Sequence, residues 1–166
     1  MPLRWRLERL VRLQDSKKVH KLTCHISGHL DLSPNEFKEH YVPKLDEAIA
    51  KGYSFVVGDA PGADLMAQSY LFMKTNDVVV YHMYDVARHN VGFVRRGGYI
   101  SDLDRDAAMT AASDADIAWV RPGREKSGTA KNIERRSVIK VWGNTTATQE
   151  SKISQADHLF QDGRTY

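Results

Sequence analysis

The chain has 166 residues, of which 42% are apolar, and it carries a formal net charge of +3. This length is enough for one compact domain with a substantial core, but it is too short for two such domains. No apolar stretch approaches the roughly 20 residues that a membrane-spanning helix needs, and Cys24, the only cysteine, cannot form an intrachain disulfide. We therefore expect a single-domain cytoplasmic protein.

Residues 1–20 have the pattern of a basic amphipathic helix. Seven lysines and arginines over residues 1–21 outnumber Glu8 and Asp15, and four apolar residues follow a helical spacing, namely Leu3, Leu7, Leu10 and Val11. Such a helix either packs on its own domain or on a second subunit, or it binds an acidic surface, nucleic-acid phosphates or an anionic membrane. The pattern favours the packed helix and is compatible with a homo-oligomer.

From residue 21 onward, segments of strand and helix character alternate. Ser33 and Glu36 match a capping box with Pro34 at the first helical position, so a helix should begin there, and Pro43 should kink or break it. A long polar loop is expected over 85–101. The sequence predicts strands over 21–27, 54–57, 78–84, 115–120 and 138–142, and helices over 36–50, 63–74, 102–113 and 129–136.

This alternation predicts an α/β fold, with a Rossmann-like, doubly wound and mostly parallel sheet of about five strands flanked by helices. We place this domain at residues 21–143. The basic extension over residues 1–20 precedes it, and a polar tail over residues 144–166 follows it and either docks as a short helix or stays loose.

The turns that follow the strands form the candidate site, because ligands of such sheets bind outside the carboxyl ends of the strands. Glycine at such a turn lets the backbone bend sharply or approach a ligand, and free N–H groups at a helix start can hold a phosphate or carboxylate. The candidate ligand-binding residues at these turns are Ser27, Gly28, Gly58, Asp59, Gly62, Ala63, Asp64, Ser127, Gly128 and Thr129.

Charged and aromatic residues complete the candidate site. Arg105 is the candidate for neutralising a phosphate, and its alternative role is an ion pair with Asp59 or with an aspartate of its own helix. Asp59 ends a strand, where it could contact ribose or act as a general base or nucleophile, whereas Asp64 is placed to cap a helix. Tyr99 is a candidate for stacking on a base. Further arginines near the candidate site are Arg88, Arg95, Arg96, Arg121 and Arg124.

The ordered set of motifs resembles the SLOG superfamily, which includes the DprA (Smf) proteins and the LOG phosphoribohydrolases. The motifs are SGHLD at 27–31, GDAPGAD at 58–64, RDAAM at 105–109 and DADIAWV at 114–120, leading into SGT at 127–129. The chain is also similar to nucleoside 2-deoxyribosyltransferases. These resemblances imply ligands built from a base, a ribose and phosphate.

One position sets this chain apart from the catalytic members of those families. There a glutamate stands three residues after the Gly-Thr threonine, and this chain has Asn132 at that position. An amide cannot form a glycosyl ester or accept a proton. The resemblance therefore favours the small sensor-type members, with Asn132 as a further ligand-binding candidate.

Three functions follow from these observations. The first is binding or sensing of a nucleotide-like small molecule. The second is an enzyme acting on N-glycosidic bonds, by deoxyribosyl transfer or nucleoside-monophosphate hydrolysis, with Asp59 as the carboxylate. The third is a nucleic-acid-associated protein that uses residues 1–20. The sequence predicts no metal and no other cofactor, because His25 and His29 straddle a strand end without helical spacing and no P-loop is present.

Overall fold

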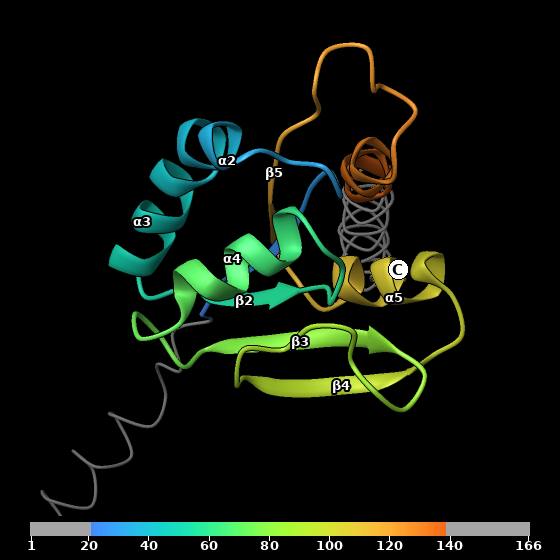
Figure 1. The fold of residues 1–166 in the computed structure, drawn as a ribbon, viewed down its shortest axis with the longest axis horizontal. Coiled ribbons are helices and arrows are strands. Elements are labelled where there is room, and N and C mark those ends of the chain that lie inside the picture. Colours follow the sequence, from blue (N-terminus) through green and yellow to red (C-terminus); the bar gives the residue numbers. More distant parts are fainter. Residues whose placement is uncertain (1–20, 139–166) are drawn as a thin grey trace, which may run out of the picture.

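The computed structural model describes residues 21–138 (Figure 1). The expected basic helix over residues 1–20, the polar tail over residues 144–166 and all but the first residue of the expected strand 138–142 lie outside the described residues. Within residues 21–138, a five-stranded parallel sheet is flanked by five helices, which is an α/β, Rossmann-like fold.

The strands lie in the order β4-β3-β2-β1-β5. They are β1 (Thr23–Ser27), β2 (Ser54–Val57), β3 (Val78–Met83), β4 (Val94–Tyr99) and β5 (Ala115–Ala118). The helices are α2 (Pro34–His40), α3 (Val42–Ala50), α4 (Ala63–Leu71), α5 (Asp102–Ala111) and a helix over 128–138, which reaches the last described residue. The sequence placed most of these elements within a few residues of their observed bounds.

The start of α2 is fixed by the predicted capping box. The Ser33 side chain accepts a hydrogen bond from the Glu36 N–H, and the Glu36 carboxylate accepts one from the Ser33 N–H. α2 and α3 are separate helices that meet at Tyr41, two residues before Pro43, and this agrees with the break that Pro43 predicts.

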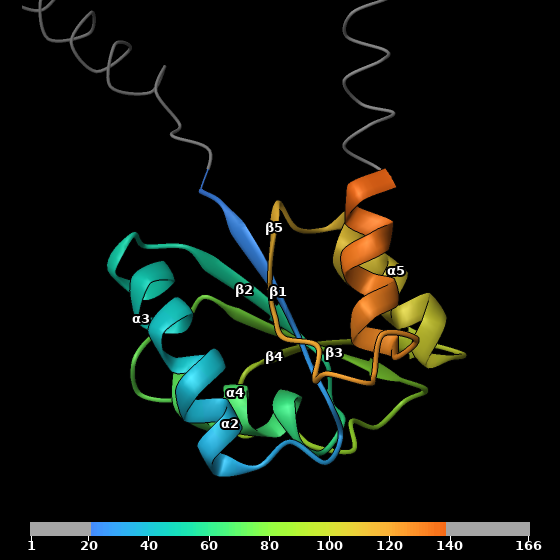
Figure 2. The ribbon, with the colours of Figure 1, turned by 90° about the horizontal axis from the view of Figure 1, so that it is seen from above.

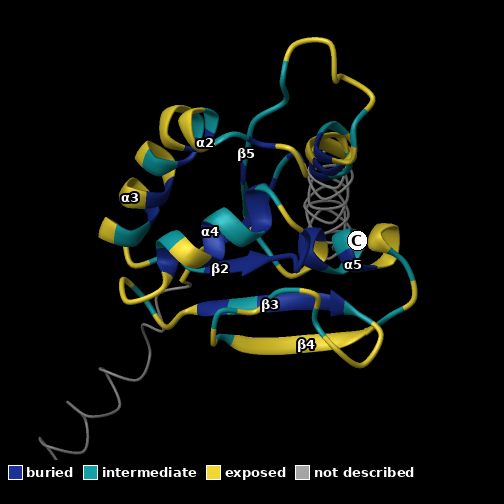
Figure 3. Cartoon of the chain, viewed as in Figure 1, coloured by how far each residue is buried: buried dark blue, intermediate teal, exposed yellow. Residues whose placement is uncertain are grey.

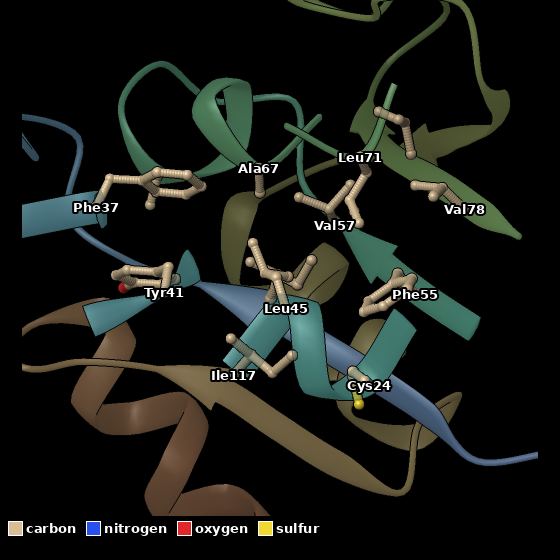
Figure 4. Close-up of a cluster of buried hydrophobic side chains, with 14 of the residues drawn as sticks. Cys24, Phe37, Tyr41, Leu45, Phe55, Val57, Ala67, Leu71, Val78 and Ile117 are labelled. Carbon is tan, nitrogen blue, oxygen red and sulfur yellow. The ribbon is translucent and has the colours of Figure 1, made fainter. Parts of the chain in front are cut away.

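Helices cover both faces of the sheet (Figure 2). α2, α3 and α4 lie on one face, where they bury the larger core cluster around Ile26, Leu45, Phe55 and Val57 (Figure 4). α5 and the helix 128–138 lie on the other face, where Met109 packs in a smaller cluster. Because successive strand residues point to opposite faces, every residue of a central strand can be buried.

β4 corrects the expectation of a continuous polar loop over 85–101. It is parallel to β3 although only residues 84–93, without a helix, connect the two strands. β4 lies at the edge of the sheet and is exposed along almost its whole length (Figure 3). Its sequence, VRRGGY, lacks the apolar alternation that marks a half-buried strand. The expected strand at 138–142 is wrong at Val138, which is helical.

Candidate functional site

A cavity of about 810 Å³ lies outside the carboxyl end of β1. β1 is the point at which the order of the strands reverses, since β2 to β4 lie on one side of it and β5 on the other. Open α/β sheets bind their ligands at such a switch point. The charged side chains that line the cavity are four basic ones, Arg88, Arg105, Arg124 and Lys126, and four acidic ones, Asp64, Asp102, Asp106 and Glu125.

Ser27 and Gly28 lie where β1 meets the cavity. The Ser27 side chain is buried, and its Oγ has no hydrogen-bond partner among the described residues. A Cβ at Gly28 would lie 2.3 Å from the Tyr41 hydroxyl oxygen and 2.4 Å from the Ala63 Cβ. Gly28 is therefore required by close packing beneath the cavity, whereas the Ser27 hydroxyl retains its full hydrogen-bonding capacity.

Gly62 and Ala63 form the start of α4 and do not line the cavity. Gly62 has φ +75°, and a Cβ there would lie 2.4 Å from the carbonyl oxygens of His29 and Leu30. Ala63 is completely buried, and its N–H donates to the His29 carbonyl at 3.1 Å. These residues hold two loops together, so the glycine serves the fold here.

Asp59 is completely buried and lies behind the cavity lining. The Arg88 backbone N–H and Nε donate to its Oδ2 at 2.8 and 3.2 Å. Nη2 of Arg88 and Nη1 of Arg105 donate to its Oδ1 at 2.8 and 2.9 Å. Burial alone would raise the pKa of Asp59, but these hydrogen bonds and charges outweigh it and hold the pKa below its usual value. Both carboxylate oxygens are thus occupied by protein donors.

Arg105 lines the cavity and is 5% exposed. Besides Asp59, its guanidinium contacts Asp102 at 2.8 Å and donates twice to Asp106, at 3.1 and 2.8 Å. Of the two roles predicted for Arg105, the structure shows the ion pairs with aspartates. We call Asp59, Arg88, Asp102, Arg105 and Asp106 the ion-pair cluster.

Asp64 is the buried carboxyl group of the cavity lining with the fewest protein partners. It accepts one hydrogen bond, from the Ala60 N–H to Oδ2 at 3.2 Å. Its closeness to Arg105 depends on Gly58, where a Cβ would lie 2.2 Å from Asp64 Oδ2 and 3.2 Å from Arg105 Cζ. Burial raises the pKa of Asp64 to about 7, and nearby aspartates act in the same direction. Asp64 therefore changes its charge near neutral pH.

The opposite wall of the cavity is the segment 123–129, which leads into the helix 128–138. Ser127 caps this helix, since its Oγ accepts a hydrogen bond from the Ala130 N–H at 3.3 Å. Gly128 and Thr129 provide the next N–H groups, for which residues 21–138 show no acceptor. Arg124 and Lys126 are exposed. The wall combines a helix start with side-chain cations, both of which attract anions.

Asn132 lines the cavity and is buried within a hydrogen-bonded chain. Its Nδ2 donates to Asp106 Oδ2 at 3.1 Å, and its Oδ1 accepts from Arg135 Nη1 at 2.8 Å. The amide thereby connects the ion-pair cluster to the helix 128–138, a role that needs one donor and one acceptor. A carboxylate would place a second negative charge beside Asp106.

Tyr99 and three of the arginines lie elsewhere. Tyr99 stacks on Tyr81 with ring centroids 5.8 Å apart and does not line the cavity. Arg121 pairs with Glu36 and Asp31. The remaining two, Arg95 and Arg96, belong to β4.

Sequence reasoning missed the contribution of Gln68, a fully buried side chain of α4. Its Nε2 donates to the carbonyls of Gly58 and His89, and its Oε1 accepts from the Val91 N–H. Together with the bonds between Arg88 and Asp59, these bonds fix the segment 84–93 in place of a crossover helix. A glutamine on the apolar side of α4 was the available signal, because a buried amide must find partners.

Comparison of the chain with known protein families finds no match, and neither curated proteins nor solved structures give a significant one. No helix within residues 21–138 combines the length and apolar character needed to cross a membrane. The same residues contain no group of three or more histidine, cysteine, aspartate or glutamate side chains arranged to hold a metal ion.

Proposed function

We propose that the protein binds a nucleotide or nucleotide-derived ligand in the switch-point cavity, as a small SLOG-type binding or sensing protein. The main support is that the start of the helix 128–138 and the Ser27 hydroxyl line the same cavity, and neither has a partner for its spare hydrogen-bonding groups within residues 21–138. The volume of about 810 Å³ lies in the range of small-molecule sites. The anionic group of the ligand would lie at the segment 123–129, beside Arg124 and Lys126.

The rest of the cavity suits a group rich in hydrogen-bond donors. Asp106 lines it on the side of α5, and a carboxylate accepts hydrogen bonds from ribose hydroxyls or base amines. The Asp64 carboxyl group lines it on the side of α4 and can accept such a hydrogen bond through its carbonyl oxygen when it is protonated as well. The exposed side chains of Leu30 and Pro61 in the lining add apolar surface for a base. A nucleotide with its phosphate at the segment 123–129 and its sugar and base on the side of α4 and α5 would provide hydrogen-bond partners for both walls.

Binding is favoured over catalysis by the two residues on which the enzyme hypothesis depends. Asn132 stands where the catalytic relatives of the resembled families have glutamate, and both carboxylate oxygens of Asp59 are bonded to Arg88 and Arg105. If the protein cleaves N-glycosidic bonds, Asp64 is the better candidate for the carboxyl group. Incubation with nucleosides and their monophosphates tests this alternative, and we expect no release of free base.

Calorimetric titration with AMP, GMP, CMP and UMP tests the binding proposal. The sharpest variant is Gly128→Pro, because proline at the first helical position removes one N–H while remaining compatible with a helix start. Gly128→Ala is the matched control, since a Cβ there meets no atom within 4 Å and the N–H is kept. At least one nucleotide should bind the wild type and Gly128→Ala, and Gly128→Pro should bind it about tenfold more weakly.

Two results would contradict the proposal. One is the absence of binding by all four nucleotides. The other is equal affinity of Gly128→Pro and wild type. Binding only to long nucleic acid, with a steep dependence on salt, would instead favour the role of residues 1–20, which lie outside the described residues.

A further inference from the structure

The charges that line the cavity balance when all of them are ionised. Four basic side chains face four acidic ones, so the lining as a whole then offers an anion no net attraction. Among the acidic ones, Asp102 and Asp106 form ion pairs with Arg105, and Glu125 is exposed. Asp64 is buried and has no ion-pair partner among the described residues. Because the ionised Asp59 behind the lining also pairs with Arg88 and Arg105, protonation of Asp64 makes the net charge around the cavity one unit more positive.

The neighbours of Asp64 do not neutralise it. From α5 it faces Arg105 and Asp106, from the turn after β2 it faces Asp59, and from the end of α2 it faces Tyr41. Arg105 is the only cation among them, and its guanidinium bonds to Asp59, Asp102 and Asp106. Among the described residues, Asp64 itself receives a hydrogen bond only from the Ala60 N–H. An ionised Asp64 would thus be an incompletely compensated charge in a buried wall, and an anion in the cavity would add to that cost.

We propose that binding of an anionic ligand in this cavity is coupled to the uptake of one proton by Asp64. The inference rests on the proposed function and adds a regulation to it. The neutral carboxylic acid removes the repulsion and gains an O–H that can donate to a ligand oxygen. Since the pKa of Asp64 lies at about 7 before any ligand arrives, the coupling operates across the neutral range. The protein would then bind its ligand more tightly in a slightly acidic medium.

Titration with inorganic sulfate between pH 6 and pH 8 tests the coupling without interference from the ligand, because sulfate keeps its charge over this range whereas a phosphate monoester titrates near pH 6. We expect the wild type to bind sulfate about tenfold more tightly at pH 6 than at pH 8, which corresponds to one linked proton. Asp64→Asn mimics the neutral acid in shape and should bind with nearly the same affinity at both pH values.

Glu125→Gln is the matched control. It also removes one negative charge from the lining, but hydrogen bonds from its own backbone N–H and that of Gly123 hold the pKa of Glu125 below its usual value, far from the range tested. This variant should bind sulfate more tightly at every pH and keep the tenfold difference. AMP, measured in parallel at pH 6, reports whether the cavity binds a nucleotide at all.

The outcomes separate the two proposals. If AMP and sulfate bind but Asp64→Asn keeps the wild-type pH dependence, the coupling belongs to another group, such as His29, and the inference is overturned. If sulfate affinity is the same at pH 6 and pH 8 in the wild type, it is overturned as well. If neither probe binds at pH 6, the proposed function itself fails.

Discussion

Two groups of charged residues border the same cavity, and they differ in how far the protein itself uses their hydrogen-bonding capacity. In the ion-pair cluster, Arg105 and Asp59 are buried and bonded to each other and to their neighbours. In the segment 123–129, Arg124 and Lys126 are exposed, and the N–H groups of Gly128 and Thr129 have no acceptor in the described part of the chain. A residue that lines a cavity does not necessarily contact a ligand. Ligand binding needs hydrogen-bond donors that are not already bonded to other groups of the protein, and the segment 123–129 provides them.

Substitution of Asp59 should give the largest effect on stability. Asp59→Ala leaves the buried Arg105 short of one partner and releases Arg88, which holds the segment 84–93. Removal of one partner from a buried ion pair typically costs about 3–5 kcal/mol of unfolding free energy, and we expect a loss of that order in denaturant titrations.

Asp102→Ala is the control within the same cluster. The Asp102 side chain is 56% exposed, so its loss should lower the unfolding free energy by less than about 1 kcal/mol. Equal losses for the two variants would mean that Asp59 is no more important to the fold than a surface partner, and the distinction between the two groups would disappear.

Asp64 lines the same cavity as both groups, and its effect on stability should depend on pH. The folded-state pKa of about 7 lies above the ordinary value of 3.8. The folded state therefore holds the proton more tightly, so the contribution of Asp64 is fully present below about pH 4 and is lost as the pH rises through 7. The shift in the pKa of Asp64 limits this loss of unfolding free energy to about 4 kcal/mol.

The measurement is the unfolding free energy of wild type and Asp64→Asn at pH 5 and pH 8. The wild type should lose more stability than the variant over this interval, and at pH 8 Asp64→Asn should be the more stable protein. A parallel pH dependence of the two proteins would show that Asp64 is ionised without cost in the folded state.

The fold could be predicted from the sequence because its signals are local. The capping box at Ser33 and the apolar runs of β1, β2 and β3 each follow from neighbouring residues. β4 could not be found in this way, since an exposed edge strand with two glycines carries no burial pattern. Val138 was predicted in a strand because it is β-branched, but it extends the helix 128–138. Intrinsic preference for strand or helix is weak and is often overridden by the rest of the fold.

The site was predicted as a set of positions rather than a set of roles. Ser27, Gly128 and Asn132 do line one cavity, which follows from the rule that strand ends meet at one edge of a parallel sheet. The sequence could not show that Asp59 is bonded to Arg88, 29 residues away, because pairing over that distance depends on how the chain folds. It likewise could not show that Asp64, which has the pattern of a cap, is a buried carboxyl group of the cavity wall.

The smallest expected change in stability belongs to the segment 123–129, and there the contrast with the ion-pair cluster becomes sharpest. Arg124→Ala and Lys126→Ala should each change the unfolding free energy by less than about 0.5 kcal/mol, because both side chains are exposed.

If these cations contact the ligand phosphate, each variant should bind AMP about threefold to tenfold more weakly, and the affinity should depend less on salt. Arg121→Ala is the neighbouring control, since Arg121 is bonded to Glu36 and Asp31 and does not line the cavity. Its AMP affinity should equal that of the wild type. Equal affinities for all three variants and the wild type would show that the anionic group of AMP does not bind at this segment.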